Sequence, residues 1–427
     1  MDARPKTRRV NRERNAPAPQ PPRGAKQIVI PMTRQQYDEI WHDAERTRAA
    51  VAGWARSAPE LFPPGFDRGY RLHGFGRPSR KLPGIKLRKL LTADGASYWL
   101  RPSFVAGYMT GTVDELAYPL LLAAHGVPPW LLTIGFGHSA MYWHRVVERL
   151  GRSSLVGATI RDPARLPVHL AADEHHADWV GQKGYVATTV GGGCILGVAL
   201  TASADDVHLR EAYGVFAAEA RDVDPEYAPA TVNTDGWAAT RNAFQALFPA
   251  IAVVLCFLHG FLKVRDRCRK ARELHRRVWE VYRAATAAEF RRLMGELQRW
   301  CATQTWTAAV GAMLEKLWGK TEAYVVAYDH PGCQRTSNAV DRPMNRLCRL
   351  MYAGRGLHGH QGSSELRLRG WALLMNFRPY ARRSNRPRSH DSPAHRLNGK
   401  RYHEHWLHNL MASTSLMGFR NPKPAIG

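Results

Sequence analysis

The sequence lacks the patterns of a disulfide scaffold, a zinc ribbon and a membrane span. Its six cysteines are scattered over 427 residues without a paired Cys-x-x-Cys motif. No uninterrupted apolar run reaches the roughly 18 residues of a transmembrane helix, and the basic N-terminus has no apolar stretch typical of a signal peptide. The triple glycine at 191–193 is not followed by the Lys-Ser or Lys-Thr of a phosphate-binding loop, which argues against an ATPase. These absences favour a cytoplasmic protein with no membrane partner.

Acidic residues are scarce beside basic ones. The chain has 36 Asp plus Glu against 61 Lys plus Arg, a formal net charge of +25. A surplus of this size attracts polyanions, because each phosphate that Lys or Arg neutralises releases condensed counterions. We therefore expect DNA as the partner and a nucleoid-associated location, and the length predicts two to three domains.

The first two segments differ sharply in composition. Residues 1–26 are mostly Arg, Pro and Ala, which predicts a disordered basic arm that either lies along phosphates or is a solvated tail. In residues 27–112, apolar side chains at helical spacing predict one helix from Thr33 to about Ser57. Two strands are expected around the Asp94-Gly95 turn.

Residues 113–160 contain two apolar helical patterns, VDELAYPLLLAAHG and SAMYWHRVVERLGR, joined by a segment with Gly and Pro breaks. This order predicts a helix-turn-helix-like DNA-binding region, in which His144, Arg145 and Arg149 of the second helix face a DNA groove. A helical hairpin packed on the core produces the same pattern. Only the positive charge of the whole chain favours DNA binding.

Strand and helix patterns alternate over residues 165–260. A short strand ends at Asp173, a hairpin follows over 185–200, and a second strand ends at Asp235 before a helix and a buried strand. The pattern predicts an α/β fold with one mixed sheet, and open sheets of this kind place their sites at strand ends. Carboxylates suit Mg²⁺, and two such ions clamp the oxygens of a phosphoryl displacement. The alternative is that Asp235 is a turn residue and Asp173 a helix cap.

Four segments occur in a characteristic order: HLAADEHHADWVGQKGYVATTV, VNTDGWAATRNAFQALFP, VVLCFLHG and RTSNAVDRPMNRLCRLMY. This order resembles the Mutator-like superfamily of DDE transposases over roughly residues 165–380. The resemblance implies an RNase H-like catalytic core whose acids are Asp173, Asp235 and Asp341, with two Mg²⁺ or Mn²⁺ ions as cofactors. It also implies a structural Cys-x-x-His motif at Cys256 and His259.

The third acid departs from the family pattern, which usually has glutamate at that position. Asp341 is one methylene shorter and is followed by Pro343, so a helix-capping role is the alternative. Glu322 and Glu365, each inside a predicted helix, are the rival third acids. The matches at Thr336, Asn338 and Ala339 favour Asp341 (the block reads RTSNAVDR).

The rest of the chain is assigned by composition and by the same resemblance. Residues 261–330 form a predicted α-helical insertion whose Arg-rich faces grip DNA, and residues 331–380 the C-terminal helices of the core. Residues 381–427 form a predicted basic tail whose histidines, His408 among them, are expected at the surface or in contact with phosphates. Cys256 and His259 with Cys268 and His275 match no zinc-finger spacing, so a buried pair bracing a helix on the sheet is favoured. Lys183, Arg335 and Asn338 complete the predicted DNA contacts.

These observations predict a DNA transposase of a bacterial-type insertion sequence. It has a mostly helical N-terminal DNA-binding region and acts as a homodimer or higher oligomer on transposon ends and target DNA. One alternative is a nuclease with the same RNase H-like core. The other is a helix-turn-helix DNA-binding protein derived from a transposase that has lost catalysis. Metal-dependent cleavage separates the first two from the last.

Overall fold

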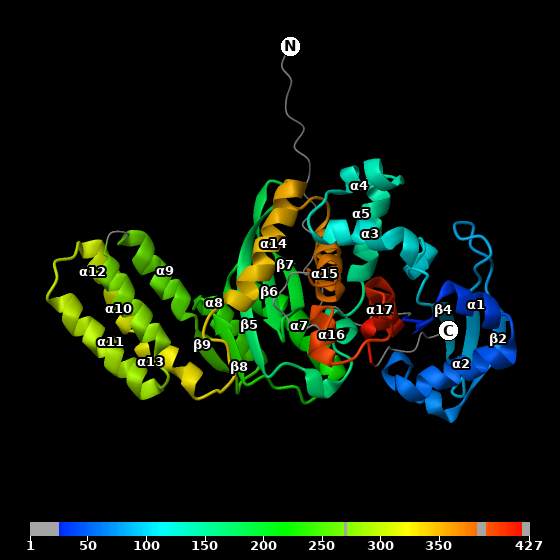
Figure 1. The fold of residues 1–427 in the computed structure, drawn as a ribbon, viewed down its shortest axis with the longest axis horizontal. Helices are drawn as coiled ribbons and strands as arrows, with labels where there is room; N and C mark the ends of the chain where they lie inside the picture. The colour runs from blue at the N-terminus through cyan, green and yellow to red at the C-terminus, as the bar shows by residue number, and fades with distance from the viewer. Residues whose placement is uncertain (1–24, 269–270, 382–389, 421–427) are drawn as a thin grey trace, which may run out of the picture.

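The computed structural model describes residues 25–268, 271–381 and 390–420. The basic arm predicted over residues 1–26 therefore lies almost entirely outside the described residues. The molecule is elongated: a helical lobe lies at one end, the largest sheet is in the middle, and a smaller N-terminal sheet is at the other end (Figure 1). No helix in the described part of the chain is long and apolar enough to cross a membrane.

A five-stranded mixed sheet forms the middle of the molecule, in the order β7-β6-β5-β8-β9. The strands are β5 (His169–Trp179), β6 (Gln182–Gly191), β7 (Cys194–Thr201), β8 (Thr231–Thr234) and β9 (Ala252–Leu255). Neighbours among β5, β6 and β7 run antiparallel, whereas β8 and β9 run parallel to β5. This order confirms the predicted mixed sheet, and the antiparallel pairing of β6 with β7 confirms the predicted hairpin. Gly192 and Gly193 form the turn of that hairpin with positive φ angles.

Strand β5 does not end at Asp173, and that prediction is wrong. The strand continues to Trp179 because β6 pairs with it as far as the pair Trp179–Gln182. Pairing between β5 and β8 stops much earlier, at Ala171 and Asn233. Asp173 therefore lies just beyond the point where β5 loses its parallel neighbour.

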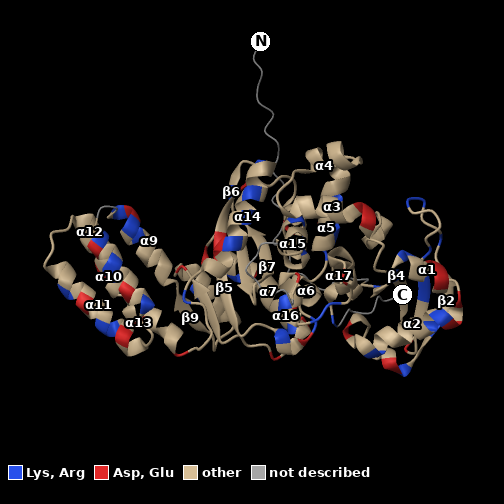
Figure 2. Ribbon diagram, in the orientation of Figure 1, with Lys and Arg blue, Asp and Glu red and all other residues tan. Residues whose placement is uncertain are grey.

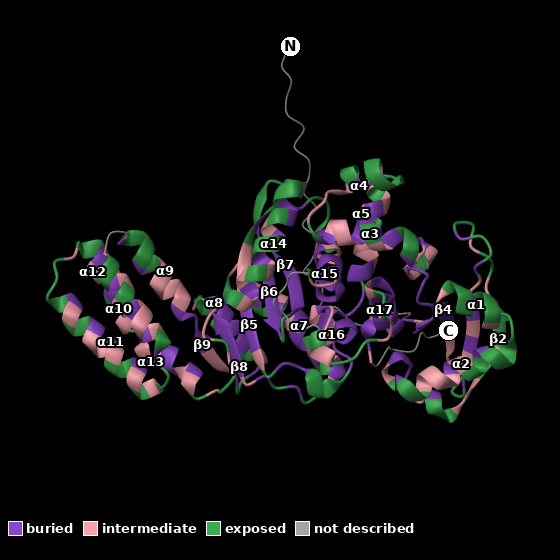
Figure 3. Cartoon of the chain, in the orientation of Figure 1, coloured by how far each residue is buried: buried purple, intermediate pink, exposed green. Residues whose placement is uncertain are grey.

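Helices cover both faces of the central sheet. Helices α7 (Asp206–Val223) and α8 (Ala238–Leu247) bury aromatic side chains such as Phe216 and Phe244 against one face. Helices α14 (Asn338–Gly354) and α15 (Gln361–Phe377) form a second core on the other face (Figure 3). Alternate residues of β5 point to opposite faces, so Ala171 belongs to the second core and Ala172 to the first.

The segment predicted as helix-turn-helix-like contains a third helix in place of the turn. Its helices are α3 (Val113–Ala124), α4 (Pro129–Phe136) and α5 (Ala140–Gly151). The prolines of the connector begin a helix, since Pro128 is the N-cap of α4 and Pro129 its first residue. Helix α5 packs along α15, so the segment is built into the core.

Residues 27–112 contain both strands and helices, as the predicted helix and hairpin imply, but with more strands than expected. A four-stranded sheet with the order β1-β4-β3-β2 is packed with two helices. Its elements are β1 (Gln27–Ile30), α1 (Arg34–Ile40), α2 (Ala44–Ser57), β2 (Tyr70–Phe75), β3 (Arg88–Thr92) and β4 (Ser97–Pro102). The prediction of a single helix from Thr33 to Ser57 is wrong, because the segment forms two helices. Asp43 is the N-cap of the second helix, α2, and its side chain accepts from the amides of Glu45 and Arg46. The hairpin predicted around Asp94 and Gly95 is confirmed as β3 and β4.

The lobe at the far end of the molecule is helical, as predicted. It contains α9 (Phe257–Arg267), α10 (Arg272–Arg283), α11 (Ala287–Ala302), α12 (Ala308–Trp318) and α13 (Thr321–Val325). These helices bury a hydrophobic core of their own, which includes Val278, Phe290 and Leu314. The predicted buried strand is shorter than expected, because Cys256 is already the N-cap of α9.

The described part of the predicted basic tail is not a tail. This part of the chain forms α16 (Pro393–Asn398) and α17 (Trp406–Ser413). Helix α17 lies between the N-terminal sheet and the core, where it also contacts α6 (Leu155–Thr159) (Figure 1). Leu407 and Leu410 of α17 are fully buried. His408, which was expected at the surface, is also buried, and burial lowers its pKa to about 3.

Candidate active site

Asp173 and Asp235 lie next to each other at the edge where β5 and β8 separate. The last pair between the strands joins Ala171 and Asn233, and each aspartate follows two residues later. Two residues along a strand return the side chain to the same face, and neighbouring strands are about 4.8 Å apart. The two carboxylates therefore face the same side, which is the side that α14 covers.

The Asp235-Gly236 pair forms the sharp turn that joins β8 to α8. The backbone amide of Trp237 donates to Oδ1 of Asp235 at 2.9 Å, and Gly236 has a φ of +94°. Only glycine takes this conformation at low cost. The turn keeps Asp235 exposed at the strand end, so one short sequence provides both the bend and the accessible carboxylate.

Asp173 is crowded by other acids. Burial first, and then the negative charges of Glu174 and Asp235, raise its pKa to about 7. One backbone amide, that of Glu174, donates to Oδ1 of Asp173 at 2.9 Å and works against this shift. Like charges held this close favour either a proton or a cation between them.

Glu174 is an additional acid that the sequence analysis missed. It points to the opposite face of β5, where the Tyr213 hydroxyl of α7 and the Thr240 hydroxyl of α8 both donate to its Oε1. Burial raises its pKa despite these two hydrogen bonds. It was missed because the strand was expected to end at Asp173. Once β5 continues past Asp173, the next residue must face the other layer of helices.

Asp341 lies in the first turn of α14, the helix that packs on β5. The Ser337 hydroxyl donates to its Oδ2 at 2.9 Å. The pKa of His259 is raised mainly by its hydrogen bond to Cys256, and the charges of Asp235 and Asp341 contribute to the same shift. His259 is therefore within electrostatic reach of both acids.

Cys256 and His259 connect the end of β9 and the start of α9 to the N-terminus of α14. The amide of Ser337 donates to Sγ of Cys256 at 3.1 Å, and the Ser337 hydroxyl lies 3.4 Å from Nδ1 of His259. Burial alone would raise the pKa of Cys256, but hydrogen bonds to His259 and Ser337 outweigh it and lower the pKa. The contact links β9 and α9 to α14, whereas the sequence favoured a buried pair that braces a helix on the sheet; His259 is only partly buried.

The rival third acids face elsewhere. Glu322 is exposed and forms an ion pair with Arg291 at 2.7 Å inside the helical lobe. Glu365 lies on α15 and accepts from the amide of Leu200 in β7, at 3.4 Å. The acid on the helix that covers the aspartate pair is Asp341.

Some predicted DNA contacts are engaged within the protein. The Arg335 guanidinium donates to the carbonyls of Tyr282 and Ala284 and lies 4.6 Å from the ring centroid of Tyr328, so it holds the end of α10 instead of projecting toward DNA. His144 is half-buried, 3.6 Å from Glu148. Burial lowers the pKa of His144, so it provides no reliable positive charge.

The remaining predicted contacts are more accessible. Lys183 is exposed on β6, with its ammonium 5.4 Å from the ring centroid of Tyr185. Arg145 and Asn338 are exposed on α5 and at the start of α14. The Arg149 guanidinium lies 5.4 Å from the ring centroid of Tyr108.

The donor set fits Mg²⁺ or Mn²⁺ in part. Within the described ranges, no group of three or more His, Cys, Asp and Glu side chains is arranged to hold a metal ion. Neither the predicted triad of Asp173, Asp235 and Asp341 nor the zinc alternative with Cys268 and His275 forms such a group among these residues. Mg²⁺ commonly takes only one or two protein carboxylates and completes its shell with substrate phosphates and water, and the crowded pair of Asp173 and Asp235 meets that requirement.

Comparison with known proteins adds no assignment. Neither a scan of protein-family models nor a search of curated proteins gives a match to this chain.

Proposed function

We propose that the protein is a DDE-type DNA transposase, a metal-dependent polynucleotidyl transferase that cleaves DNA at insertion-sequence ends and joins it to target DNA. The observation that carries the proposal is the placement of Asp173 and Asp235 at matching positions on adjacent strands, where the charge of Asp235 helps to raise the pKa of Asp173. A surface acid used only for solubility has no reason to be buried beside two others.

The topology supports an RNase H-like core. The first acid is on the central strand β5, which has an antiparallel hairpin on one side and two parallel strands on the other. The second acid follows the next strand, β8, and the proposed third acid is on a helix that packs on β5. The helical lobe lies between the second and third acids in the sequence, as the resemblance to DDE transposases implies.

In this proposal the protein's own groups bind and orient the reacting DNA. Asp173 and Asp235 provide carboxylate oxygens on one face, and Asp341 completes the set from α14. Bound Mg²⁺ or Mn²⁺ would lower the pKa of the attacking water or 3′-hydroxyl and stabilise charge on the phosphate. The Cys256–Ser337–His259 contacts hold the start of α14, so they set the position of Asp341.

DNA is the expected substrate because of charge. Lysine and arginine side chains are spread over the helical lobe, α14 and α16 (Figure 2), within a chain whose formal net charge is +25. Contacts of this kind position a phosphate backbone without reading its sequence. A homodimer or higher oligomer on DNA remains part of the proposal.

The test is cleavage of insertion-end DNA by aspartate variants. Asp173→Asn and Asp235→Asn should each lower Mg²⁺-dependent cleavage at least about 100-fold, because metal stabilisation supplies several kcal/mol and each 1.36 kcal/mol is tenfold in rate. Both variants should keep DNA binding, since phosphate contacts come from other residues. Asp341→Asn should behave like them.

Glu322→Gln is the matched control, because its carboxylate is exposed and paired with Arg291 in the helical lobe. It should cleave like the unaltered protein. Retained cleavage in Asp173→Asn or Asp235→Asn would sink the metal assignment. Cleavage without joining to target DNA would indicate a nuclease, and binding without any cleavage would indicate a DNA-binding protein only.

A further inference from the structure

A cavity of about 100 Å³ lies between the N-terminal sheet, α3, α5 and the C-terminal segment. Its walls are largely apolar, with Leu116 and Val146 among them. The described lining contains three cationic residues, Lys26, Arg101 and Arg149. It contains no aspartate or glutamate. The cavity therefore has a net positive lining inside an apolar shell.

Arg101 carries most of the argument, because it is only 2% exposed and has no acidic partner among the described contacts. Its Nε donates to the amide oxygen of Gln27 at 3.1 Å, and its Nη1 donates to the carbonyl of Val105. Burial lowers the pKa of Arg101 to about 10. A buried guanidinium is normally paired with an anion, since desolvating an uncompensated charge is costly.

The rim of the cavity adds further positive charge. The guanidinium groups of Arg149 and Arg152 lie 5.4 Å and 5.7 Å from the ring centroid of Tyr108. Tyr108 has a φ of +60°, a left-handed conformation that is unusual for a bulky residue. Strained residues of this kind are concentrated at ligand sites. The ring lies beside Arg149 in the cavity lining, and Arg152 adds a second positive charge next to it.

We infer that this cavity binds a phosphate group, with Arg101 at its base and Lys26 and Arg149 at its rim. Its volume of about 100 Å³ is well above the roughly 10–15 Å³ that one water needs by the same measure, so a small tetrahedral anion fits. Ser153 in the lining carries a hydroxyl that is an additional donor. Apolar walls exclude water and strengthen the attraction between an anion and the buried guanidinium.

The site is separate from the aspartate pair. The cavity is lined by residues of β1, β4, α3 and α17, whereas Asp173 lies on β5 and Asp235 directly after β8 in the central sheet. The inference therefore does not depend on the proposed transposase activity. The phosphate group has two chemical sources, free inorganic phosphate and the DNA backbone.

The experiment measures binding of inorganic phosphate to the full chain by calorimetry, with sodium chloride at matched ionic strength as the reference. Phosphate should bind and raise the thermal unfolding midpoint, while chloride should do neither. Arg149→Met and Lys26→Met, both at the rim, should weaken phosphate binding at least tenfold. Two rim variants are used because Arg101→Met removes a buried group and risks misfolding.

Arg210→Met is the matched control, because it removes one positive charge from an exposed position on α7, away from the cavity. Its phosphate affinity should not change. The inference fails if phosphate acts no differently from chloride, or if both rim variants bind phosphate as tightly as the control.

DNA binding distinguishes the two sources. If the cavity holds a backbone phosphate, Arg149→Met should reduce the log-log salt slope of DNA binding by about 0.9, the value for one phosphate contact, and inorganic phosphate should compete with DNA. If free phosphate is the ligand, Arg149→Met should leave the salt slope of DNA binding unchanged but should still weaken phosphate binding measured by calorimetry. Either result supports the site and identifies its occupant.

Discussion

At the scale of single residues, the ionisation of Asp173 links the candidate site to the stability of the fold. Burial first, and then the charges of Glu174 and Asp235, raise its pKa to about 7. An aspartate in the unfolded chain has a pKa of about 3.9. Between these two values the folded protein keeps a proton that the unfolded chain releases.

We therefore expect metal-free protein to lose stability as pH rises from about 4 to about 7, since the unfolded state binds fewer protons across that window. His259, whose raised pKa acts in the same direction, contributes in part. Asp173→Asn should make the slope shallower and raise stability at pH 8. Urea unfolding at several pH values in the presence of a chelator measures the change.

Glu211→Gln, which removes an exposed acid on α7, serves as the control and should leave the slope as it is. An identical slope in Asp173→Asn would show that its carboxyl ionises normally in the folded state. Adding Mg²⁺ at pH 8 should stabilise the unaltered protein more than Asp173→Asn, because the cation replaces the proton between the acids.

The strand pattern suggested Asp173 and Asp235, but it left open a turn or helix-cap role for them. The resemblance to DDE transposases implied that both are acids of the site. The sequence did not predict Glu174 with Tyr213 and Thr240, since that contact joins three elements that only the folded sheet brings together. Arg335 was assigned to DNA for its charge. Its actual partners, two backbone carbonyls of α10, leave no pattern in a sequence.

At the scale of elements, α5 and α15 approach so closely that glycine is needed at their crossing. A Cβ on Gly370 would lie 2.0 Å from the carbonyl oxygen of Val147, and one on Gly151 would lie 1.8 Å from that of Leu366. Backbone atoms cannot move aside as a flexible side chain can. This contact fixes the helical segment of residues 113–151 to the core.

Gly370→Ala should consequently destabilise the protein by about 1–3 kcal/mol or more, through overpacking against a backbone atom. Chemical denaturation followed by circular dichroism measures the loss. Gly214→Ala in α7 is the matched control, because its Cβ would meet nothing closer than 3.9 Å. It should stabilise the helix by about 0.5–1 kcal/mol, and equal effects of the two substitutions would contradict the close crossing.

Elements with strong local signals were predicted well, and those set by partners were not. The hairpin of β6 and β7 follows from its glycines, and α7 from its 3.6-residue period. The length of β5 depends on β6, and β1 forms a strand because it pairs with β4. Such pairings override local propensity.

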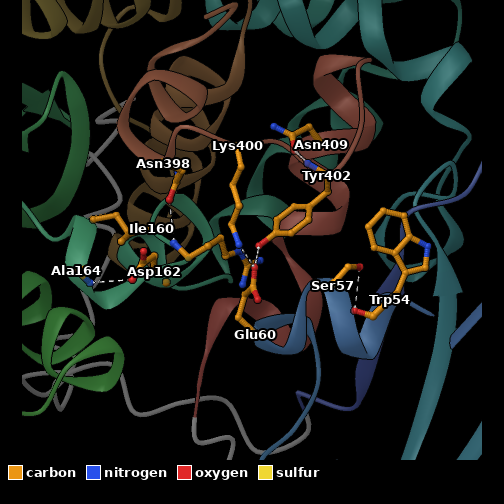
Figure 4. A network of polar contacts seen from close by, with 12 residues as sticks. Trp54, Ser57, Glu60, Ile160, Asp162, Ala164, Asn398, Lys400, Tyr402 and Asn409 are labelled. Atoms are coloured by element: carbon orange, nitrogen blue, oxygen red, sulfur yellow. Dashed lines mark hydrogen bonds and ion pairs between the residues drawn. The ribbon is translucent and has the colours of Figure 1, made fainter. Parts of the chain in front are cut away.

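At the scale of the whole molecule, the C-terminal segment joins the N-terminal region to the core. Glu60 accepts from the Lys400 ammonium at 2.8 Å and from the Tyr402 hydroxyl, and Asn398 accepts from the backbone amide of Arg161 at 3.1 Å (Figure 4). The sequence suggested a tail because basic residues and histidines dilute the apolar ones there. Its short apolar helix, α17, has a clear role only once two other parts of the chain are in place.

Leu410 tests this role, since it is fully buried in α17 within the core of α3, α5 and α15. Leu410→Ala should destabilise the protein by about 2–5 kcal/mol, through the lost apolar contact and the cavity left behind. Leu131→Ala, at a leucine of α4 that is 42% exposed, should change stability by no more than about 0.5 kcal/mol. Thermal and urea unfolding of both variants measure the difference. A dispensable tail would make the two substitutions equivalent, whereas a segment that joins two parts of the molecule makes the buried leucine costly to lose.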